Sequence, residues 1–457
     1  MSDWRRHASL VGALAVLLLA LGPVTGRAQE KEKAQEGQEQ KCNLTGTDVT
    51  QKAEDMLGEA TKAESDSAAA DKYQSAMRLI TVALSSNAQD PAALWLKGRA
   101  KVGLRNFAAA DSALDQFVSL KPGCATLAHN LRQQAWVELY NTGIRAYRAG
   151  HDTAAMAAFD TANIILQDPR SLNNSALLHQ RIGDTDSAAD IYRKTIRTGG
   201  DSAQVRAATI NLAELLKSQG KQEEAFKVYR DYLSEHPKAV LPRINLAVGM
   251  AQAGQKDSAQ AMLTSMLERQ DLRYEDLADL GTGLLQVQDY KSAEEAFGRA
   301  HKANPYAREG LSDLVQAAME AGDFKTAAAA GDSLLDRYPY DKDAYRAVAQ
   351  SLDRLGNKKA VQARLKTMQS LPLEFTDLRM VRQAGAYVVQ GQVTGGTAAG
   401  SRVQIPFTFY GADGSAVAQK TVTIEVPQGD TQGQFQVQVQ SDAPIVGFTY
   451  GKAQSAS

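Results

Sequence analysis

Residues that could carry chemistry are scattered through this sequence. Its six histidines include no pair, with each other or with a cysteine, at the spacing of a metal site. The sequence contains neither the His-Glu-x-x-His helix of zinc peptidases nor the Gly-x-Ser-x-Gly turn of serine hydrolases. Two acidic pairs open predicted helices, where negative charge complements the helix dipole; they are Glu223 with Glu224 and Glu294 with Glu295.

Gly281, Thr282 and Gly283 resemble half of a phosphate-binding loop. They lie inside a predicted helix, however, so we interpret Gly281 as a small packing residue. The sequence therefore predicts a protein that is not an enzyme and that binds no metal and no cofactor.

Cys42 and Cys124 are the two cysteines of the chain. In an exported protein such a pair can form a disulfide, and the alternative is two isolated thiols. A bridge would fix the segment before the helical region to an early helix pair. The choice depends on the distance between the two Cα atoms, which the sequence does not give.

The net charge of −1 predicts that the protein does not bind nucleic acid, since it provides no basic footprint. Hydrophobic residues make up 44% of the 457 residues, as in ordinary globular proteins. Aromatic residues make up only 6%, and alanine is abundant. This composition favours thin layers of helices over one thick core.

A small residue recurs every 34 residues, at Ala225, Ala259, Ala293 and Ala327. Residues 271–305 show the repeating unit, which reads as two short helices joined by a turn. The apolar or small positions of this unit are Leu277, Leu280, Gly281, Leu284, Ala293, Phe297 and Ala300, and Pro305 closes it.

This pattern resembles the tetratricopeptide-repeat family, whose units of 34 residues are helix pairs. The resemblance implies an α-helical solenoid, because one pair cannot bury both its faces and stacked neighbours can. We expect about nine helix pairs in residues 47–371, with degenerate first and last pairs. An unusually long first helix is expected at 127–147, and extra loop residues at 198–201.

The resemblance also implies a concave face, lined by the first helices, that binds a protein or peptide partner. Family members often bind a peptide backbone through an asparagine placed like Asn211 and Asn245, although asparagine can also simply be common there. The basic clamp that some members use for a C-terminal carboxylate is not matched at Ile210, Ile244, Ala278 and Ser312. We expect the groove to include Asn211, Glu214, Asn245, Thr282, Gln316, Arg346 and Gln350.

Residues 1–28 have the layout of a secretory signal peptide, with a basic start, an apolar run at 10–21 and small residues before Gln29. The run is shorter than a membrane span of about 20 residues. The polar residues 29–46 predict a flexible tether. We therefore expect an exported bacterial protein, periplasmic or extracellular; the alternative is an inner-membrane anchor formed by an uncleaved signal.

After residue 372 the apolar period changes from about 3.6 to 2. Residues 372–451 thus predict a small, all-β, antiparallel Ig-like sandwich, followed by a tail at 452–457. Pro406 predicts an edge strand or a bulge. The segment resembles the FxLyD-like β domains of bacterial envelope proteins in Phe407, Phe409, Tyr410, Asp413, Gly414 and Phe435.

The sequence as a whole predicts an exported, non-enzymatic scaffold that binds a protein or peptide on the concave solenoid face. The alternative is a module that binds glycan or cell-wall material through its β domain. Few aromatic residues occur in the turns of that domain to stack on sugars, and Tyr410 is the main candidate.

Overall fold

The computed structural model describes residues 42–383, 385–429 and 431–455. The predicted signal peptide, and the predicted tether up to residue 41, lie outside these residues. The chain divides into two compact units, Met1–Tyr232 and Leu233–Ser457, with the boundary inside one helix, and we describe each by itself.

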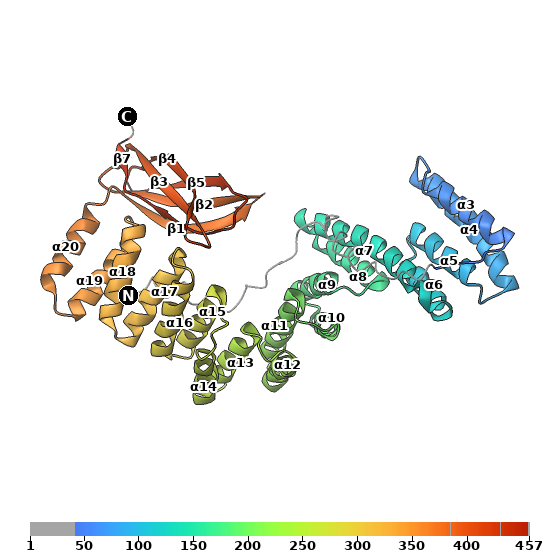
Figure 1. Ribbon diagram of the computed structural model, residues 1–457, viewed down its shortest axis with the longest axis horizontal. Coiled ribbons are helices and arrows are strands. Elements are labelled where there is room, and N and C mark those ends of the chain that lie inside the picture. Colours follow the sequence, from blue (N-terminus) through green and yellow to red (C-terminus); the bar gives the residue numbers. More distant parts are fainter. Residues whose placement is uncertain (1–41, 384, 430, 456–457) are drawn as a thin grey trace. The chain divides into compact units, whose positions relative to one another are not determined.

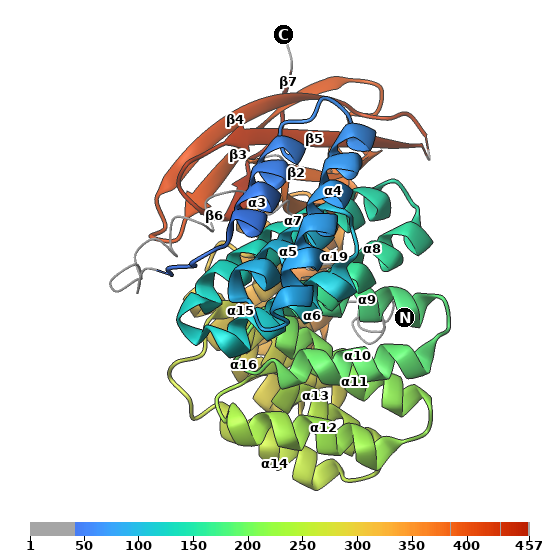
Figure 2. The same cartoon turned by 90° about the vertical axis from the view of Figure 1, so that its right-hand side faces the viewer.

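The first unit consists of consecutive helix pairs, whose two members run side by side, as α3 with α4 in Figure 2. A short 3-10 helix, Pro122–Cys124, precedes α7. The helix α7 has 24 residues and explains the long spacing expected there. The helices are α3 (Asp48–Ala60), α4 (Asp66–Ser86), α5 (Pro91–Gly103), α6 (Phe107–Leu120), α7 (Ala125–Arg148), α8 (Asp152–Ile165), α9 (Pro169–Arg181), α10 (Thr185–Arg197), α11 (Ala203–Ser218) and α12 (Gln222–Glu235).

The second unit continues the pairs and then changes to strands (Figure 1). Its helices are α13 (Leu241–Gln252), α14 (Lys256–Met266), α15 (Tyr274–Gln286), α16 (Tyr290–Ala303), α17 (Arg308–Ala321), α18 (Phe324–Arg337), α19 (Lys342–Arg354) and α20 (Lys358–Gln369). Within the described residues the eighteen helices form nine pairs, which confirms the predicted number.

Small residues allow the two helices of a pair to approach closely. The recurring alanines Ala225, Ala259, Ala293 and Ala327 are all buried. A Cβ added at Gly281 would lie 2.7 Å from the ring of Phe297, so the first helix accepts the aromatic ring of the second only because this position has no side chain. Gly281 is therefore a packing residue, as predicted.

From α5 to α20, each turn within a helix pair contains a residue with positive φ, and in most pairs a side-chain cap of the second helix follows it. Gly183, Gly220, Gly254 and Gly322 end first helices in the left-handed conformation that glycine adopts freely. Aspartates such as Asp289 then accept a hydrogen bond from a backbone N–H of the next helix, here from Ser292 at 3.3 Å.

The strands form two antiparallel sheets, one in the order β1-β2-β5 and the other in the order β4-β3-β6, with β7 also paired to β3. The rings of Phe375 and Phe407, one from each sheet, lie 6.4 Å apart in the shared core, which confirms the predicted sandwich. The strands are β1 (Leu373–Gln383), β2 (Ala386–Gly395), β3 (Arg402–Gly411), β4 (Ala416–Glu425), β5 (Gln432–Gln440), β6 (Ile445–Tyr450) and β7 (Gln454–Ser455).

The prediction that Pro406 marks an edge strand or a bulge is wrong. Pro406 lies in β3, which has neighbours on both sides, and its register with Thr421 of β4 is regular. On the other side, β6 pairs with residues from Phe407 onward and β7 with Val403 and Gln404. Pro406 therefore lies opposite the gap between β6 and β7, where its missing N–H costs no ladder bond.

The β domain packs on the loops that join α16 to α17 and α18 to α19. Tyr306 stacks on Tyr410 with ring centroids 4.0 Å apart. Asn304 donates to the carbonyl oxygen of Val446 at 3.0 Å, and the hydroxyl of Tyr338 donates to that of Phe448. These contacts cover the edge of β6 that does not pair with β3. The β domain and the helices of the second unit share one continuous hydrophobic core.

Candidate functional site

An asparagine recurs on the first helices, 14 residues before the buried small residue of the second helix. In the first unit it is Asn141 of α7, Asn174 of α9 and Asn211 of α11, which we call the amide row. In the second unit the same position carries Asn245 of α13, Asp279 of α15 and Asp313 of α17.

The amide row is buried at Asn174 and Asn211, half-buried at Asn141, and incompletely hydrogen-bonded. Asn174 is 8% exposed and Asn211 is 3% exposed. Among the described residues, Oδ1 of Asn141, Nδ2 of Asn174 and both polar atoms of Asn211 have no partner at hydrogen-bond distance. A buried polar group left unpaired costs about 1–3 kcal/mol, so the row has unused capacity for hydrogen bonds.

Tyrosines lie beside two members of the row. Burial raises the pKa of Tyr140, and the charge of Arg170 and the neighbouring Asn174 side chain oppose this rise. Burial likewise raises the pKa of Tyr192, and Asn211 lowers it. The hydroxyl of Tyr192 donates to Oε1 of Gln180 at 2.9 Å, and its oxygen keeps lone pairs for a donor such as the amide of Asn211.

The predicted groove residues are distributed over both units. Asn211 is buried and Glu214 is exposed, 3.4 Å from Lys217. These two residues belong to the first unit. The remaining five belong to the second: Asn245, Thr282 and Gln316 are half-buried on α13, α15 and α17, and Arg346 and Gln350 are exposed on α19.

The sequence reasoning missed Asn141 and Asn174, because the long helix α7 and the extra residues between α10 and α11 break the period of 34. Counting back 14 residues from the alanines Ala155 and Ala188 would have found both. The repeat is therefore better followed by its own buried alanine than by a fixed period.

Carboxylates replace the amide on α15 and α17 of the second unit. Burial raises the pKa of Asp313 to about 7, Glu309 adds to the rise and Arg308 opposes it. Burial, with Asp276 and Glu275, raises the pKa of Asp279 to about 6. The side chain of Asp279 is exposed to solvent, whereas that of Asp313 is half-buried. Asp313 is therefore the stronger candidate for a carboxyl that ionises near neutral pH.

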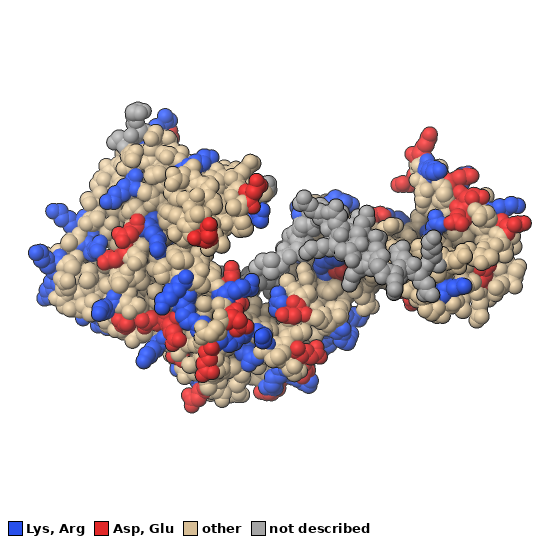
Figure 3. Space-filling model, viewed as in Figure 1, with Lys and Arg blue, Asp and Glu red and all other residues tan. Residues whose placement is uncertain are grey.

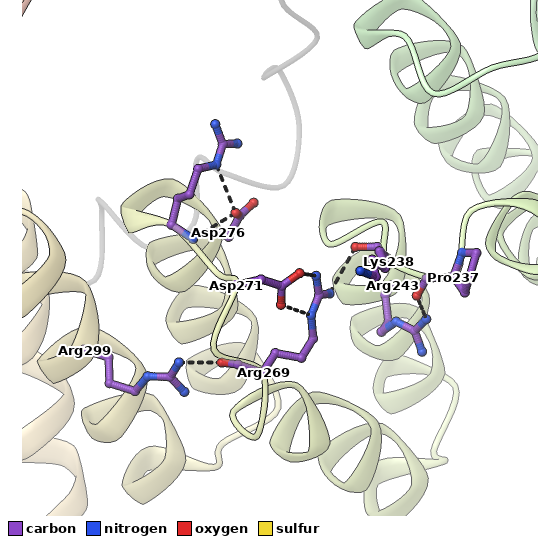
Figure 4. Close-up of polar contacts among 8 residues, drawn as sticks. Pro237, Lys238, Arg243, Arg269, Asp271, Asp276 and Arg299 are labelled. Carbon is purple, nitrogen blue, oxygen red and sulfur yellow. Dashed lines mark hydrogen bonds and ion pairs between the residues drawn. The ribbon is translucent and has the colours of Figure 1, made fainter.

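The loops before α13 and α15 are held by arginines that donate to backbone carbonyls (Figure 4). Arg243 donates to Pro237 at 2.6 Å, and Arg269 to Lys238 at 3.0 Å. Arg299 of α16 donates to the carbonyl of Arg269 at 2.6 Å. These bonds fix the starts of two first helices and hence the positions of the side chains on them.

One cluster in the first unit has the residue types of a catalytic triad but not its arrangement. His179 contacts Asp184 at 2.9 Å through Nδ1 and Asp160 at 3.2 Å through Nε2. Ser175 donates to Asp160 rather than contacting the imidazole. The cluster therefore ties α8, α9 and α10 together and activates no serine for attack.

The prediction that both acidic pairs open a helix is confirmed for one pair and wrong for the other. Glu223 and Glu224 lie in the first turn of α12, as expected. Helix α16 already begins at Tyr290, so Glu294 lies in its second turn.

In the described part of the chain no three His, Cys, Asp or Glu residues are grouped to hold a metal ion. On the face shown in Figure 3, acidic and basic side chains mix over most of the helices.

Cys42 and Cys124 form a disulfide. Leu94, Leu114 and Phe117 surround Cys124, so the bridge fixes the segment before α3 to a core between α5, α6 and α7. No helix within residues 42–455 has the length and apolar composition to cross a membrane.

Two family models match parts of this sequence. Residues 170–268 match the family described as Tetratrico peptide repeat, and residues 278–359 match that described as Tetratricopeptide repeat. These two stretches of the chain therefore belong to the tetratricopeptide-repeat family. Neither match reaches the β domain, whose resemblance to FxLyD-like domains stays a prediction. A comparison with curated proteins gives no match.

Solved structures with similar folds are also repeat proteins. A thermophilic tetratricopeptide-repeat protein of Thermus thermophilus is 19% identical, covers 40% of this chain and 99% of its own, and has a TM-score of 0.30. The C-terminal part of a repeat protein of Cytophaga hutchinsonii is 14% identical over 50% and 93%, with a TM-score of 0.37.

The TPR2AB domain of yeast Sti1, in its pHSP90 complex, is 16% identical over 52% of this chain and 90% of its own, with a TM-score of 0.24. At these identities and TM-scores, none of the three likenesses indicates a partner for this chain.

Proposed function

We propose that this protein is a non-enzymatic scaffold that binds an extended segment of a partner protein along the first helices of its repeats. The tetratricopeptide-repeat fold is that of a protein–protein interaction scaffold. The observation that supports the binding mode is the amide row, in which asparagines at one repeated position keep unpaired donors and acceptors. These atoms are covered in the free chain, so binding requires the side chains over them to move.

Amide side chains suit this role because each offers donors and an acceptor, as a peptide backbone does. The row repeats on successive first helices, so an extended chain, which rises about 3.3 Å per residue, would meet one asparagine in each repeat that it crosses. Recognition of backbone rather than side chains favours a partner segment that is unstructured before it binds.

We also propose that the protein is exported. The signal-like segment 1–28 and the disulfide between Cys42 and Cys124 support this, since disulfides persist mainly in oxidising compartments.

The alternative function, glycan binding through the β domain, has less support than peptide binding. Tyr410, its main candidate for stacking on a sugar, is already stacked on Tyr306.

The test is a double variant, Asn174→Leu with Asn211→Leu. Leucine keeps much of the volume and removes the unpaired polar groups, so the free protein should be as stable as the wild type or more so. Affinity for peptides selected from a library of unstructured sequences should fall by at least about tenfold, the effect of losing 1.4 kcal/mol. Thermal unfolding and calorimetric titration measure the two effects.

The matched control is Gln116→Leu, which removes an exposed amide from the second helix α6. It should leave peptide affinity unchanged. Unchanged affinity in the double variant would show that the amide row is not the binding surface.

A further inference from the structure

The last helix of the solenoid, α20, carries charges of one sign. Its sequence, KKAVQARLKTMQ, includes four basic residues and no acidic one. Arg364 pairs with Asp332 of α18 at 2.7 Å. The other three, Lys358, Lys359 and Lys366, are exposed, and within the described residues none of them lies within ion-pair distance of a carboxylate. We call these three residues the lysine face.

The lysine face points away from the rest of the solenoid. Helix α20 packs on α19, and no helix lies beyond it in the described chain (Figure 1). Its half-buried residues form one stripe, Ala360, Val361, Arg364 and Met368. At about 3.6 residues per turn, Lys359 and Lys366 lie on the side of the helix opposite this stripe.

Two exposed leucines lie next to the lysine face. Leu355, the C-cap of α19, is 51% exposed, and Leu365 of α20 is 37% exposed. Among the described residues of the second unit, Leu241 is the other large hydrophobic side chain that is exposed. Exposed apolar groups of this unit are therefore concentrated where the unpaired cations are.

Solubility of a terminal repeat does not require this composition. A solenoid needs a polar outer face on its end repeats, and α3, the first described helix, has one in which both signs alternate. Its exposed residues include Asp48, Lys52 and Asp55. Helix α20 differs from α3 by its single sign of charge and by its exposed leucines, which together favour attraction to a negatively charged surface with an apolar layer.

We propose that α20 attaches this protein to the surface of a membrane that contains anionic phospholipids. The lysine face contacts headgroup phosphates, and Leu355 and Leu365 enter the boundary of the acyl region. The helix has twelve residues, fewer than the roughly 20 that cross a bilayer, so it lies on the membrane. The amide row belongs to the first unit and takes no part in this contact.

The chemistry of the lysine face favours lipid over an acidic protein. An ammonium group is a hydrated point charge on a flexible stem, whereas the planar guanidinium of arginine binds a fixed carboxylate with two parallel bonds. The only arginine of α20 already pairs with Asp332 inside the protein. The helix also has no tryptophan or tyrosine, the residues that with arginine anchor most protein interfaces.

Co-sedimentation with vesicles tests the proposal. The test protein is residues 29–457, which keeps every described helix and strand and lacks the signal-like segment 1–28, whose apolar run would itself bind lipid. It should bind vesicles of phosphatidylglycerol and phosphatidylethanolamine in equal parts, and not vesicles of phosphatidylcholine alone. Added salt should weaken the binding, because it screens exposed charges.

Lys359→Gln with Lys366→Gln removes two charges from the lysine face. A lysine near an anionic surface strengthens binding about fivefold, so this variant should bind about thirtyfold more weakly. Lysine to arginine at both positions should restore the binding. The matched control, Lys291→Gln with Lys302→Gln, removes the same charge from exposed positions of α16 and should bind like the wild type.

Three outcomes would overturn the proposal. The first is a wild type that binds neither kind of vesicle, and the second is an equal loss in the lysine-face and control variants, which would be a response to net charge alone. The third comes from sedimentation velocity without lipid. If the wild type self-associates and the lysine-face variant does not, the lysine face binds an acidic surface of a second copy and not a membrane.

Discussion

At the scale of single residues, one position of the repeat carries a strained non-glycine residue in two of the helix pairs. The residue that ends the first helix has positive φ in successive pairs and is glycine in most of them. In the pair α15–α16 it is Gln288, with φ of 61°, and in α5–α6 it is Arg105, with φ of 55°. A side chain in this left-handed conformation costs about 1–2 kcal/mol.

Gln288→Gly should therefore raise the free energy of unfolding by about 1 kcal/mol, because glycine adopts this conformation without strain. The wild-type contact with Nζ of Lys256 is exposed and contributes little. Urea denaturation measures the change. The reverse substitution, Gly254→Ala, should lower the free energy of unfolding by a similar amount. The added Cβ meets no atom within 4 Å, so the loss of stability comes from the strained backbone conformation.

Asp313 makes a prediction about pH. In the unfolded chain it should ionise near pH 3.8, and in the folded protein burial raises this value to about 7. Between these values the folded protein binds the proton more tightly than the unfolded chain does. Stability contributed by the neutral carboxyl is therefore lost as pH rises from about 4 to about 7.

Asp313→Asn should remove this loss, because the amide stays neutral. Its melting temperature should exceed that of the wild type above pH 7 and differ little near pH 4. Thermal unfolding at both pH values measures the difference. An equal effect at both would mean that Asp313 does not ionise in this window.

At the scale of elements, the helices follow from local rules and the docking of the β domain does not. Buried alanines at a fixed interval predicted the helix pairs, because each helix must bury one stripe. The docking depends on side chains that no period marks. Asn304, Tyr306, Tyr338 and Tyr340 flank the prolines of the last two inter-repeat loops, and their partners lie more than 100 residues later.

The amide row shows the same limit for the site. Asn211 and Asn245 could be recognised because their Ile-Asn-Leu-Ala runs are 34 residues apart. Asn141 and Asn174 could not be found by that period, since helix α7 is longer than the others. Burial, which makes Asn211 unusual, depends on packing against neighbouring helices and is not encoded in spacing.

Gly447 of β6 should control the docking of the β domain. A Cβ there would lie 2.1 Å from the backbone carbonyl oxygen of Tyr306, which no rotamer can relieve. Gly447→Ala should therefore separate β6 from the loop and raise hydrogen exchange in residues 445–450 and 304–308. Val446→Ala is the control, because Asn304 binds the backbone of Val446 and not its side chain. Equal exchange in the two variants would contradict the docking described here.

At the scale of the whole molecule, a repeat protein is stabilised by contacts between neighbours, so a local change should have a local effect. The disulfide closes a separation of 82 residues in the first unit, and such a bridge typically contributes about 2–4 kcal/mol. In the second unit, Ala293 is fully buried between paired helices, and enlarging it should cost about 1–3 kcal/mol by overpacking.

Cys42→Ser with Cys124→Ser should therefore raise hydrogen exchange in α3 to α8 and leave the β domain protected. Ala293→Leu should do the reverse, raising exchange in α15 to α18 and leaving α3 to α6 unchanged. Lys291→Leu adds the same side chain at an exposed site on the same helix and should change neither region. If either variant loosened the whole chain equally, the two units would unfold as one cooperative body, and stability would not be a sum over neighbouring repeats.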